Sequence, residues 1–464
     1  MKKGFPNHPY IPNSVPEIER EMLDFIGLES LDDLHKNVPD ALLFKGEMDI
    51  PEAFGSEYEL RRHVEELFSG DGDCKKYLNF LGAGCWQHYV PAICDEINSR
   101  GEFLTAYGGE AYNELGRFQS QFEYQSMVAE LVGMDVVNVP AIDWPQAAAT
   151  TCAMAHRKTG RPQIVLPAIL DPEKRAIIEN FGRATIEFVT VDCTEDGQID
   201  IEDLKKKVGP QTAGVYFENP NYLGVIETRG AEISRIAHEA GAESLVGVDP
   251  ITLGVLATPP EYGADIVCGE LQPLGIHMNY GGGLAGFMAT RDEEAYVNEY
   301  PSRLFGIAPT VEPGEYGFGD VAYDRTSFGD LREGGKEYVG TQAALWGLTA
   351  GVYLATMGPV GMEEVGQTCM QNARYAVKKL NEIKGVRANS AGGLFFKEFL
   401  VDFTATGKTV SEVNDLLLSE GIFGGKDVSA EFPHLGQQAL YCVTEIHTQR
   451  DIDRLANVLA RILA

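Results

Sequence analysis

Short apolar runs alternate with amphipathic segments through the middle of the chain, and each has the length of one strand or one helix. The apolar runs predict buried strands at 163–167, 185–191, 213–218, 245–248 and 266–269. Helices are predicted between them at 172–182, 200–208 and 229–241. Four or more strand–helix units at this spacing require a mainly parallel sheet with helices on both faces. The pattern therefore predicts an α/β fold.

The segments before and after this region differ from it. Residues 1–70 predict an N-terminal arm of short helices, since Ile18 to Ile26 repeat apolar residues at helical spacing and Ser30 to Asp33 has the start signal of another helix. Such an arm has no core of its own, so we expect it to wrap over a neighbouring domain or subunit. Residues 71–340 predict the large domain, and residues 341–464 predict a C-terminal α+β domain with a linking helix.

The remaining predicted elements complete this outline. Residues 292–335 are rich in Gly, Pro and polar residues and predict loops. Further helices are predicted at 118–132, 147–157, 342–357, 362–384, 410–420 and 450–463, and further strands at 136–141, 386–389, 393–396, 399–403 and 439–443.

The charge balance narrows the classes of partner. Lys plus Arg number 38 against 69 Asp plus Glu, a net charge of −31. Nucleic acid is an unexpected partner because phosphate contacts need clustered positive charge, although salt adaptation would produce the same acidity. No apolar stretch approaches the length of a membrane span, and the N-terminus has no apolar segment after its lysines. The eight scattered cysteines are typical of core thiols, so we expect a cytoplasmic protein without a metal site.

Candidate chemistry gathers where two predicted strands end. Asp249 closes the strand at 245–248, and the strand at 266–269 is followed by Glu270, a polar turn and a Gly-rich loop. In open α/β sheets, ligands bind beyond such strand ends. An Asp at one strand end with a glycine turn behind the next is the layout of fold-type I pyridoxal phosphate (PLP) enzymes. There the Asp pairs with the pyridine nitrogen, and a Lys further along the chain forms the Schiff base.

That Lys is missing. No lysine occurs between Lys207 and Lys336, and the Schiff-base position is occupied by Gln272 and Pro273, neither of which can form an imine. The loop before the helix at 147–157, where the cofactor phosphate would bind, carries Asp143 to Pro145, a poor phosphate cradle. The chain is therefore predicted to be unable to hold PLP covalently by itself. An alternative keeps the chemistry in this chain through Lys336.

Several polar and aromatic residues are candidates for contacting a cofactor or a partner's site. They are His88, Tyr89, Tyr107, Asn113, Asp249, His277 and Asn279. The first four lie in turn-rich aromatic loops that suit ligand contact or a subunit interface, and equally suit ordinary packing. Asp249 could simply cap its turn, while His277 and Asn279 could satisfy loop backbone groups.

Sequence blocks along nearly the whole chain resemble one known family. The blocks are HPYIPNSVPEIEREMLDFIGLESLDDL, FLGAG with HYVPAI, FLTAY, FEYQSMVAELVGMDV, ENPNYLGVIE, VDPITLGVL, YGADIVCGELQPLGI with YGGGLAGFMATR, and CVTEIHTQRDIDRL. They resemble subunit 1 of the two-chain glycine dehydrogenase (decarboxylating), the P-protein of the glycine cleavage system. The resemblance implies a fold-type I transferase architecture and an α2β2 assembly with a homologous β chain that carries the PLP lysine. It also implies glycine decarboxylation and transfer of the aminomethyl group to the lipoyl H-protein.

Three blocks differ from the usual motifs of that family, namely residues 108–116, 142–146 and 335–342. All three are expected near the cofactor or substrate side. Two alternatives therefore stand beside the family function. One is a subunit of a paralogous PLP-dependent complex that acts on another small amino acid, and the other is a structural or regulatory scaffold that binds no substrate.

Overall fold

The computed structural model describes residues 13, 15–46, 48–103, 115–302, 304–321, 336–337 and 343–464. The chain divides into two compact units, Met1–Asp71 and Gly72–Ala464. Tyr107 and Asn113 lie outside the described residues. None of the described helices is both long enough and apolar enough to cross a membrane.

The first unit consists of short helices, as the sequence predicts. It contains α1 (Pro16–Ile26), η2 (Leu31–His35), η3 (Asp40–Leu42) and α2 (Glu57–Leu67). A capping box between Ser30 and Asp33 begins η2, and Gly27 ends α1 in the left-handed conformation that glycine adopts easily. Among its described residues only Leu23 is buried, so these helices do not enclose a core.

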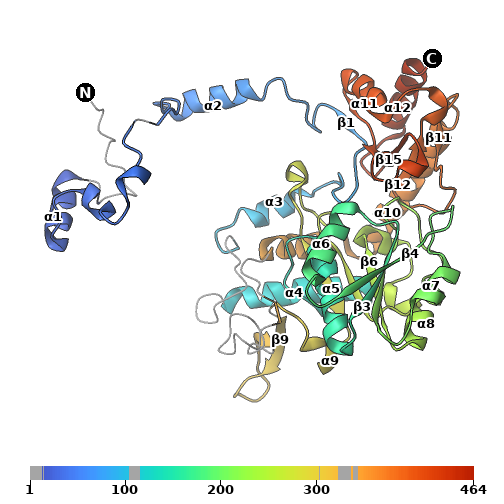
Figure 1. Ribbon diagram of the computed structural model, residues 1–464, viewed down its shortest axis with the longest axis horizontal. Coiled ribbons are helices and arrows are strands. Elements are labelled where there is room, and N and C mark those ends of the chain that lie inside the picture. The colour runs from blue at the N-terminus through green and yellow to red at the C-terminus, as the bar shows by residue number, and fades with distance from the viewer. Residues whose placement is uncertain are drawn as a thin grey trace. The chain divides into compact units, whose positions relative to one another are not determined.

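The second unit is built on a seven-stranded sheet, shown in Figure 1. Its order is β2 (Val136–Val137), β8 (Gly286–Thr290), β7 (Ile266–Glu270), β6 (Glu243–Val248), β5 (Thr212–Glu218), β3 (Gln163–Pro167) and β4 (Glu187–Val191). The five strands from β7 to β4 are parallel, while β8 runs antiparallel to β7 and to β2. The predicted mainly parallel sheet is therefore confirmed.

Helices cover both faces of this sheet. Alternate residues of each strand belong to different cores, as with Val246 in one and Leu245 in the other. One core includes side chains of α4 (Leu115–Val132), α7 (Ile201–Lys207), α8 (Gly230–Glu239) and α10 (Ala344–Leu380), and the other includes α5 (Trp144–Thr159) and α6 (Pro172–Gly182). This alternation follows from the two-residue period of a strand.

The C-terminal part forms a smaller α+β layer with its own core. Its sheet has the order β11 (Arg387–Ala388), β12 (Glu398–Asp402), β15 (Gln438–Cys442) and β14 (Lys426–Asp427), and it packs with α11 (Val410–Ser419) and α12 (Gln449–Ile462). The strand predicted at 393–396 is wrong. In that segment Phe395 instead forms an isolated bridge with Val225 of the large sheet region, which draws it away from the small sheet.

Two further predictions need correction. The helices predicted at 342–357 and 362–384 form one kinked element, α10, in which Gly358 leaves the helical conformation and Pro359 lacks the N–H group that a continuous helix needs. The region predicted as loops contains the antiparallel hairpin of β9 (Leu304–Pro309) and β10 (Tyr316–Val321). Glycines at alternate positions of β10 hide its strand pattern in the sequence.

All eight cysteines lie among the described residues and are free thiols. Five of them are buried, namely Cys94, Cys152, Cys268, Cys369 and Cys442. The prediction that several cysteines are core thiols is therefore confirmed.

Candidate functional site

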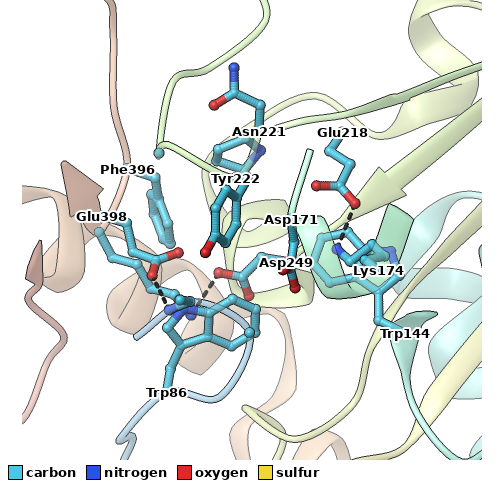
Figure 2. A pocket seen from close by; sticks show the side chains of 15 residues that line it. Trp86, Trp144, Asp171, Lys174, Glu218, Asn221, Tyr222, Asp249, Phe396 and Glu398 are labelled. Carbon is cyan, nitrogen blue, oxygen red and sulfur yellow. Dashed lines mark hydrogen bonds and ion pairs between the residues drawn. The ribbon is translucent and has the colours of Figure 1, made fainter. Parts of the chain in front are cut away.

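Three acidic residues end adjacent parallel strands at the carboxyl edge of the sheet. Glu218 ends β5, Asp249 follows β6 and Glu270 ends β7, and all three are buried. A cavity of about 40 Å³ lies at this edge, lined by side chains that include Trp86, Trp144, Lys174, Tyr222 and Asp249 (Figure 2). Lys397 lines it as well. Such a volume holds a few water molecules, whereas cofactor pockets measure about 300 Å³ or more.

Asp249 is paired with a lysine of the C-terminal layer. Its Oδ2 lies 2.7 Å from the Nζ of Lys397, and the two side chains are 6% and 2% exposed. Its other oxygen accepts a hydrogen bond from the amide of Ile251. Burial lowers the pKa of Lys397, but the surrounding groups, with the Asp249 carboxylate first among them, together raise it above its ordinary value. The lysine is therefore an ammonium, and it also lies 4.0 Å from the ring centroid of Trp86.

A second buried ion pair repeats this arrangement one strand away. The Nζ of Lys174 lies 2.6 Å from Oε1 of Glu218 and 3.4 Å from the ring centroid of Trp144. The hydroxyl of Tyr216 donates to the same carboxylate at 2.7 Å. Among the described residues, Lys174 and Lys397 are the lysines that are buried. The cavity is thus flanked by two ammonium–carboxylate pairs, each beside an indole ring. Figure 2 shows the pair of Lys174 and Glu218 next to Trp144.

The N-terminus of α5, where this fold class would bind a cofactor phosphate, is capped by the chain's own carboxyl groups. Asp143 accepts a hydrogen bond from the amide of Gln146 at 2.7 Å, and Glu270 accepts one from the amide of Trp144 at 3.1 Å. Glu270 also accepts from the amides of Gln272 and Ala285. Burial raises the pKa of Glu270 to about 8. These acids take the amide groups that would hold a phosphate.

Gln272, at the predicted Schiff-base position, has a structural role. Its Oε1 accepts from the amide of Trp86, and its Nε2 donates to the carbonyl oxygens of Trp86 and Ile276, at distances of 2.9 to 3.0 Å. The side chain is 1% exposed, and Pro273 beside it is also buried. Gln272 therefore fixes the loop that presents the Trp86 indole to Lys397.

His88 continues the network from Lys397. Its Nε2 lies 2.9 Å from the lysine Nζ, and its Nδ1 lies 2.7 Å from Oε2 of Glu445. Because an ammonium can only donate, Nε2 must accept and Nδ1 must carry the proton that is donated to Glu445. Burial alone would raise the pKa of Glu445, but the contacts with His88 and the Tyr89 amide lower it.

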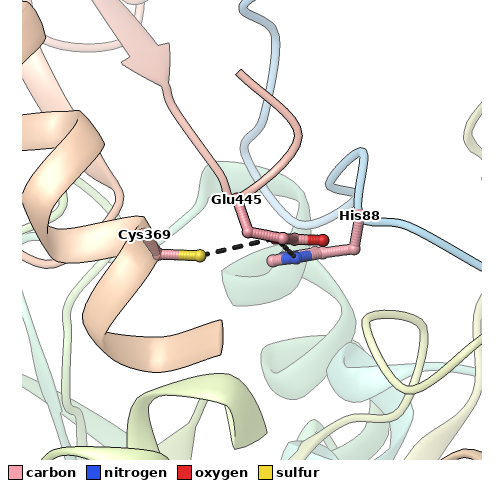
Figure 3. A group of neighbouring side chains, drawn as sticks. All are labelled: His88, Cys369 and Glu445. Carbon is pink, nitrogen blue, oxygen red and sulfur yellow. Dashed lines mark hydrogen bonds and ion pairs between the residues drawn. The ribbon is translucent and has the colours of Figure 1, made fainter. Parts of the chain in front are cut away.

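His88, Glu445 and Cys369 together have the donor types of a metal site, and they lie close to one another in Figure 3. The Sγ of Cys369 is 3.5 Å from Oε2 of Glu445. However, the histidine Nδ1 already bears a proton, and burial with the Glu445 charge raises the pKa of the Cys369 thiol. The protonation states therefore favour a hydrogen-bonded cluster over a metal centre.

The structure joins some of the predicted site residues and separates others. Asp249 and His88 meet through Lys397. Tyr89 contributes its amide to this network while its side chain is exposed. His277 makes an exposed pair with Asp95, and Asn279 lies in an exposed loop at a positive φ of 44°.

Sequence reasoning missed Lys397 and Lys174, and it did not connect Trp86 or Trp144 with any cation. Lys397 carried a usable signal, because it stands as a single cation in the apolar run LFFKEFLV. A lysine in such a run needs a buried partner. Lys174 lies in the first turn of an ordinary amphipathic helix and has no comparable signal. Lys336, the alternative Schiff-base residue, instead lies 3.5 Å from Glu299 in an ion pair.

Comparison with known proteins gives consistent results. The family model "Glycine cleavage system P-protein" matches residues 8–459. The chain is 38% identical to a protein of Pyrococcus furiosus described as "Probable glycine dehydrogenase (decarboxylating) subunit 1", over 98% of this chain and 99% of that one. A Bacillus mycoides protein with the same description is 35% identical at the same coverage of both chains.

Solved structures agree with these sequence relatives. A glycine decarboxylase (P-protein) of the glycine cleavage system, crystallised with an inhibitor, superposes with a TM-score of 0.86 at 32% identity, covering 97% of this chain and 98% of that one. A sphingosine-1-phosphate lyase from Burkholderia pseudomallei shares the fold with a TM-score of 0.65 at 14% identity, covering 91% of this chain and 94% of that one. The predicted fold-type I architecture is confirmed.

Proposed function

Because this chain belongs to the glycine cleavage system P-protein family, we propose that it is the subunit of a PLP-dependent glycine decarboxylase that lacks the Schiff-base lysine. It works with a homologous second subunit that holds the PLP. The observation that carries this proposal is the ion pair of Asp249 with Lys397 at 2.7 Å. In fold-type I enzymes this Asp pairs with the pyridine nitrogen of the cofactor, whereas here it pairs with a lysine of the same chain.

The residues of this chain do not fit PLP. The cavity of about 40 Å³ is too small for the cofactor, and the amides at the start of α5 bond to Asp143 and Glu270. The Schiff-base position is taken by Gln272, whose amide is fully engaged with the backbone. PLP supplies the electron sink for decarboxylation when it is bound by the second subunit.

The first unit, Met1–Asp71, supplies a surface for this partner. More than half of the exposed large apolar side chains of the described chain lie in it, although it is the much smaller unit. They are Ile18, Met22, Phe25, Ile26, Leu31, Leu34, Leu42, Phe44, Met48, Ile50, Phe54, Tyr58, Leu60, Val64, Leu67 and Phe68. Buried against a partner, a set of this size would supply at least the area that one side of a stable interface needs, about 800 Å².

The second subunit is the occupant that we assign to this surface, in an α2β2 assembly. The relatives are described as subunit 1, a description that implies a subunit 2. Of the residues predicted to face the partner's site, Tyr89, His277 and Asn279 have exposed side chains and remain candidates for contact. His88 and Asp249 are buried, so they act through the network that they share with Lys397.

The test is reconstitution of activity from separate subunits. The chain is purified alone, mixed with the homologous lysine-bearing subunit from the same organism, and assayed for CO₂ release from carboxyl-labelled glycine with lipoylated H-protein as acceptor. We expect no release from either subunit alone and release from the mixture. Release by this chain alone, or equal release by the second subunit without it, would contradict the proposal.

The same assay separates the alternatives for substrate and role. Alanine and serine, labelled in the same way, replace glycine in parallel reactions. Preference for one of them would point to a paralogous complex acting on another small amino acid. Assembly with the second subunit without any gain in turnover would point to a structural scaffold.

A further inference from the structure

We propose that Lys397 and Lys174 are built-in cations that replace a bound cofactor at the carboxyl edge of the sheet. Each ammonium lies on a buried carboxylate that ends a central parallel strand or immediately follows one, Asp249 for Lys397 and Glu218 for Lys174. This inference rests on the proposed function, because it explains how a subunit without PLP keeps the cofactor site of its fold closed and folded.

The strand ends at this edge carry buried negative charge. Asp249 and Glu218 are buried at the edge where this fold class binds ligands. A carboxylate removed from water is strongly unfavourable unless a cation or several donors lie against it. In a chain that binds no cofactor at this edge, that cation must come from the protein, and each carboxylate has one lysine within 2.7 Å.

Each ammonium also faces an indole, Trp86 at 4.0 Å and Trp144 at 3.4 Å from the ring centroids. Flat aromatic rings beside a carboxylate form a receptor for a flat or compact cation. In this chain both receptors are filled from within, and only about 40 Å³ remains open between them.

The two lysines come from different parts of the fold. Lys174 is on α6 of the large sheet region, whereas Lys397 precedes β12 in the C-terminal layer. Lys397 reaches Asp249 on one side and His88 on the other. It therefore joins the C-terminal layer to the sheet edge at the position where a cofactor would otherwise bridge them.

The experiment is chemical rescue of a cavity variant. Lys397→Ala removes the atoms of n-propylammonium and leaves Asp249 without its cation. We expect the melting temperature of the chain to fall by about 5 °C or more, because one partner of a buried pair is lost. Added n-propylammonium should restore at least half of this loss, whereas 1-propanol and sodium chloride at matched concentrations should restore none.

A matched surface variant controls for general effects of amines. Lys379→Ala, in the last turn of α10, removes the same atoms from a partly exposed pair with Glu382. It should lower the melting temperature by about 1 °C or less and show no rescue. Equal rescue of both variants, or a Lys397→Ala variant as stable as the parent, would overturn the proposal.

A second arm covers the case in which Lys397→Ala does not fold. The double variant Lys397→Met with Asp249→Asn removes both charges, and we expect it to fold and to melt above either single variant. In addition, pyridoxine 5′-phosphate is dialysed against the intact chain, since it keeps the ring nitrogen and phosphate but cannot react with surface lysines. Saturable one-to-one binding, or a double variant no more stable than the singles, would refute built-in occupancy. All these measurements use the chain alone. Built-in occupancy can therefore be refuted while the reconstituted decarboxylase assay succeeds, and it can be supported while that assay fails.

Discussion

The carboxyl edge of the sheet and the N-terminal unit invert the usual distribution of side chains in opposite ways. At the sheet edge, charged groups such as Lys397, Asp249 and Glu270 are buried. In Met1–Asp71, apolar groups such as Phe25 and Phe44 are exposed, and only Leu23 of its described residues is buried. The edge is complete within one chain because every buried charge named above has a partner. The described helices of the N-terminal unit enclose no core of their own, so their apolar side chains need another surface to pack on.

Removing the N-terminal unit should have the largest effect of the changes proposed below. A chain that begins at Gly72 loses the whole apolar surface, so we expect its affinity for the second subunit to fall at least 100-fold. Its own core is intact, so its melting transition should stay cooperative. Size-exclusion chromatography with light scattering measures the first effect and calorimetry the second. Undiminished complex formation would show that the partner binds elsewhere.

Breaking the edge should affect the chain itself. Asp249→Asn leaves the Lys397 ammonium buried without its carboxylate, and we expect a loss of about 3–5 kcal/mol in the free energy of unfolding. Urea denaturation measures this loss. Asp265→Asn, which disturbs a carboxylate that is 25% exposed and paired with the 45% exposed His238, is the control and should lose clearly less. Equal losses in the two variants would mean that the Asp249–Lys397 pair stabilises the chain no more than the Asp265–His238 pair does.

Glu270 should make the stability of the chain depend on pH. Burial raises the pKa of Glu270 from an ordinary value of 4.5 to about 8. Between these values the folded chain holds a proton that the unfolded chain has released, so the free energy of unfolding falls as the pH rises, by on the order of 1 kcal/mol per pH unit. Urea titrations at several pH values should show this slope weakened in Glu270→Gln and unchanged in the exposed control Glu239→Gln. An unchanged slope in Glu270→Gln would assign it to another group.

Single aromatic truncations should give the smallest effect and the sharpest contrast. Phe25 in α1 is 91% exposed, and Phe181 in α6 is 46% exposed. If the N-terminal unit binds the partner, Phe25→Ala should weaken the complex by about 1–2 kcal/mol, or roughly tenfold, while Phe181→Ala should leave affinity unchanged. Surface plasmon resonance against the second subunit measures both. Comparable losses of affinity for the two variants would mean that the second subunit does not bind the N-terminal unit in particular.

The sequence predicts the fold well where structure is local. The strand at 163–167 and the helix at 172–182 have the bounds of β3 and α6, because apolar runs and amphipathic periods report directly on burial. The hairpin of β9 and β10 was missed because glycines interrupt its alternation. The single element α10 was divided in two at Gly358, where the structure does have a break in helical geometry.

The candidate site was harder to predict because its contacts are long-range. Asp249 was identified from its place at a strand end, which is a local signal. Its partner Lys397 comes from a distant element, and no spacing in the sequence connects the two. The position of His277 and Asn279 after Gln272 predicts that they lie near the site, but both are exposed and His277 pairs with Asp95. The absence of the Schiff-base lysine can be read from the sequence, whereas the pairing of Lys397 and Lys174 with their carboxylates cannot.

We propose above that this chain depends on another subunit for its cofactor. The most direct measurement is borohydride reduction of the assembled complex in the presence of PLP, followed by peptide mapping of the pyridoxyl group. We expect the pyridoxyl group on one lysine of the second subunit and on no lysine of this chain. A stoichiometric pyridoxyl adduct on a lysine of this chain, such as Lys336, Lys174 or Lys397, would contradict it.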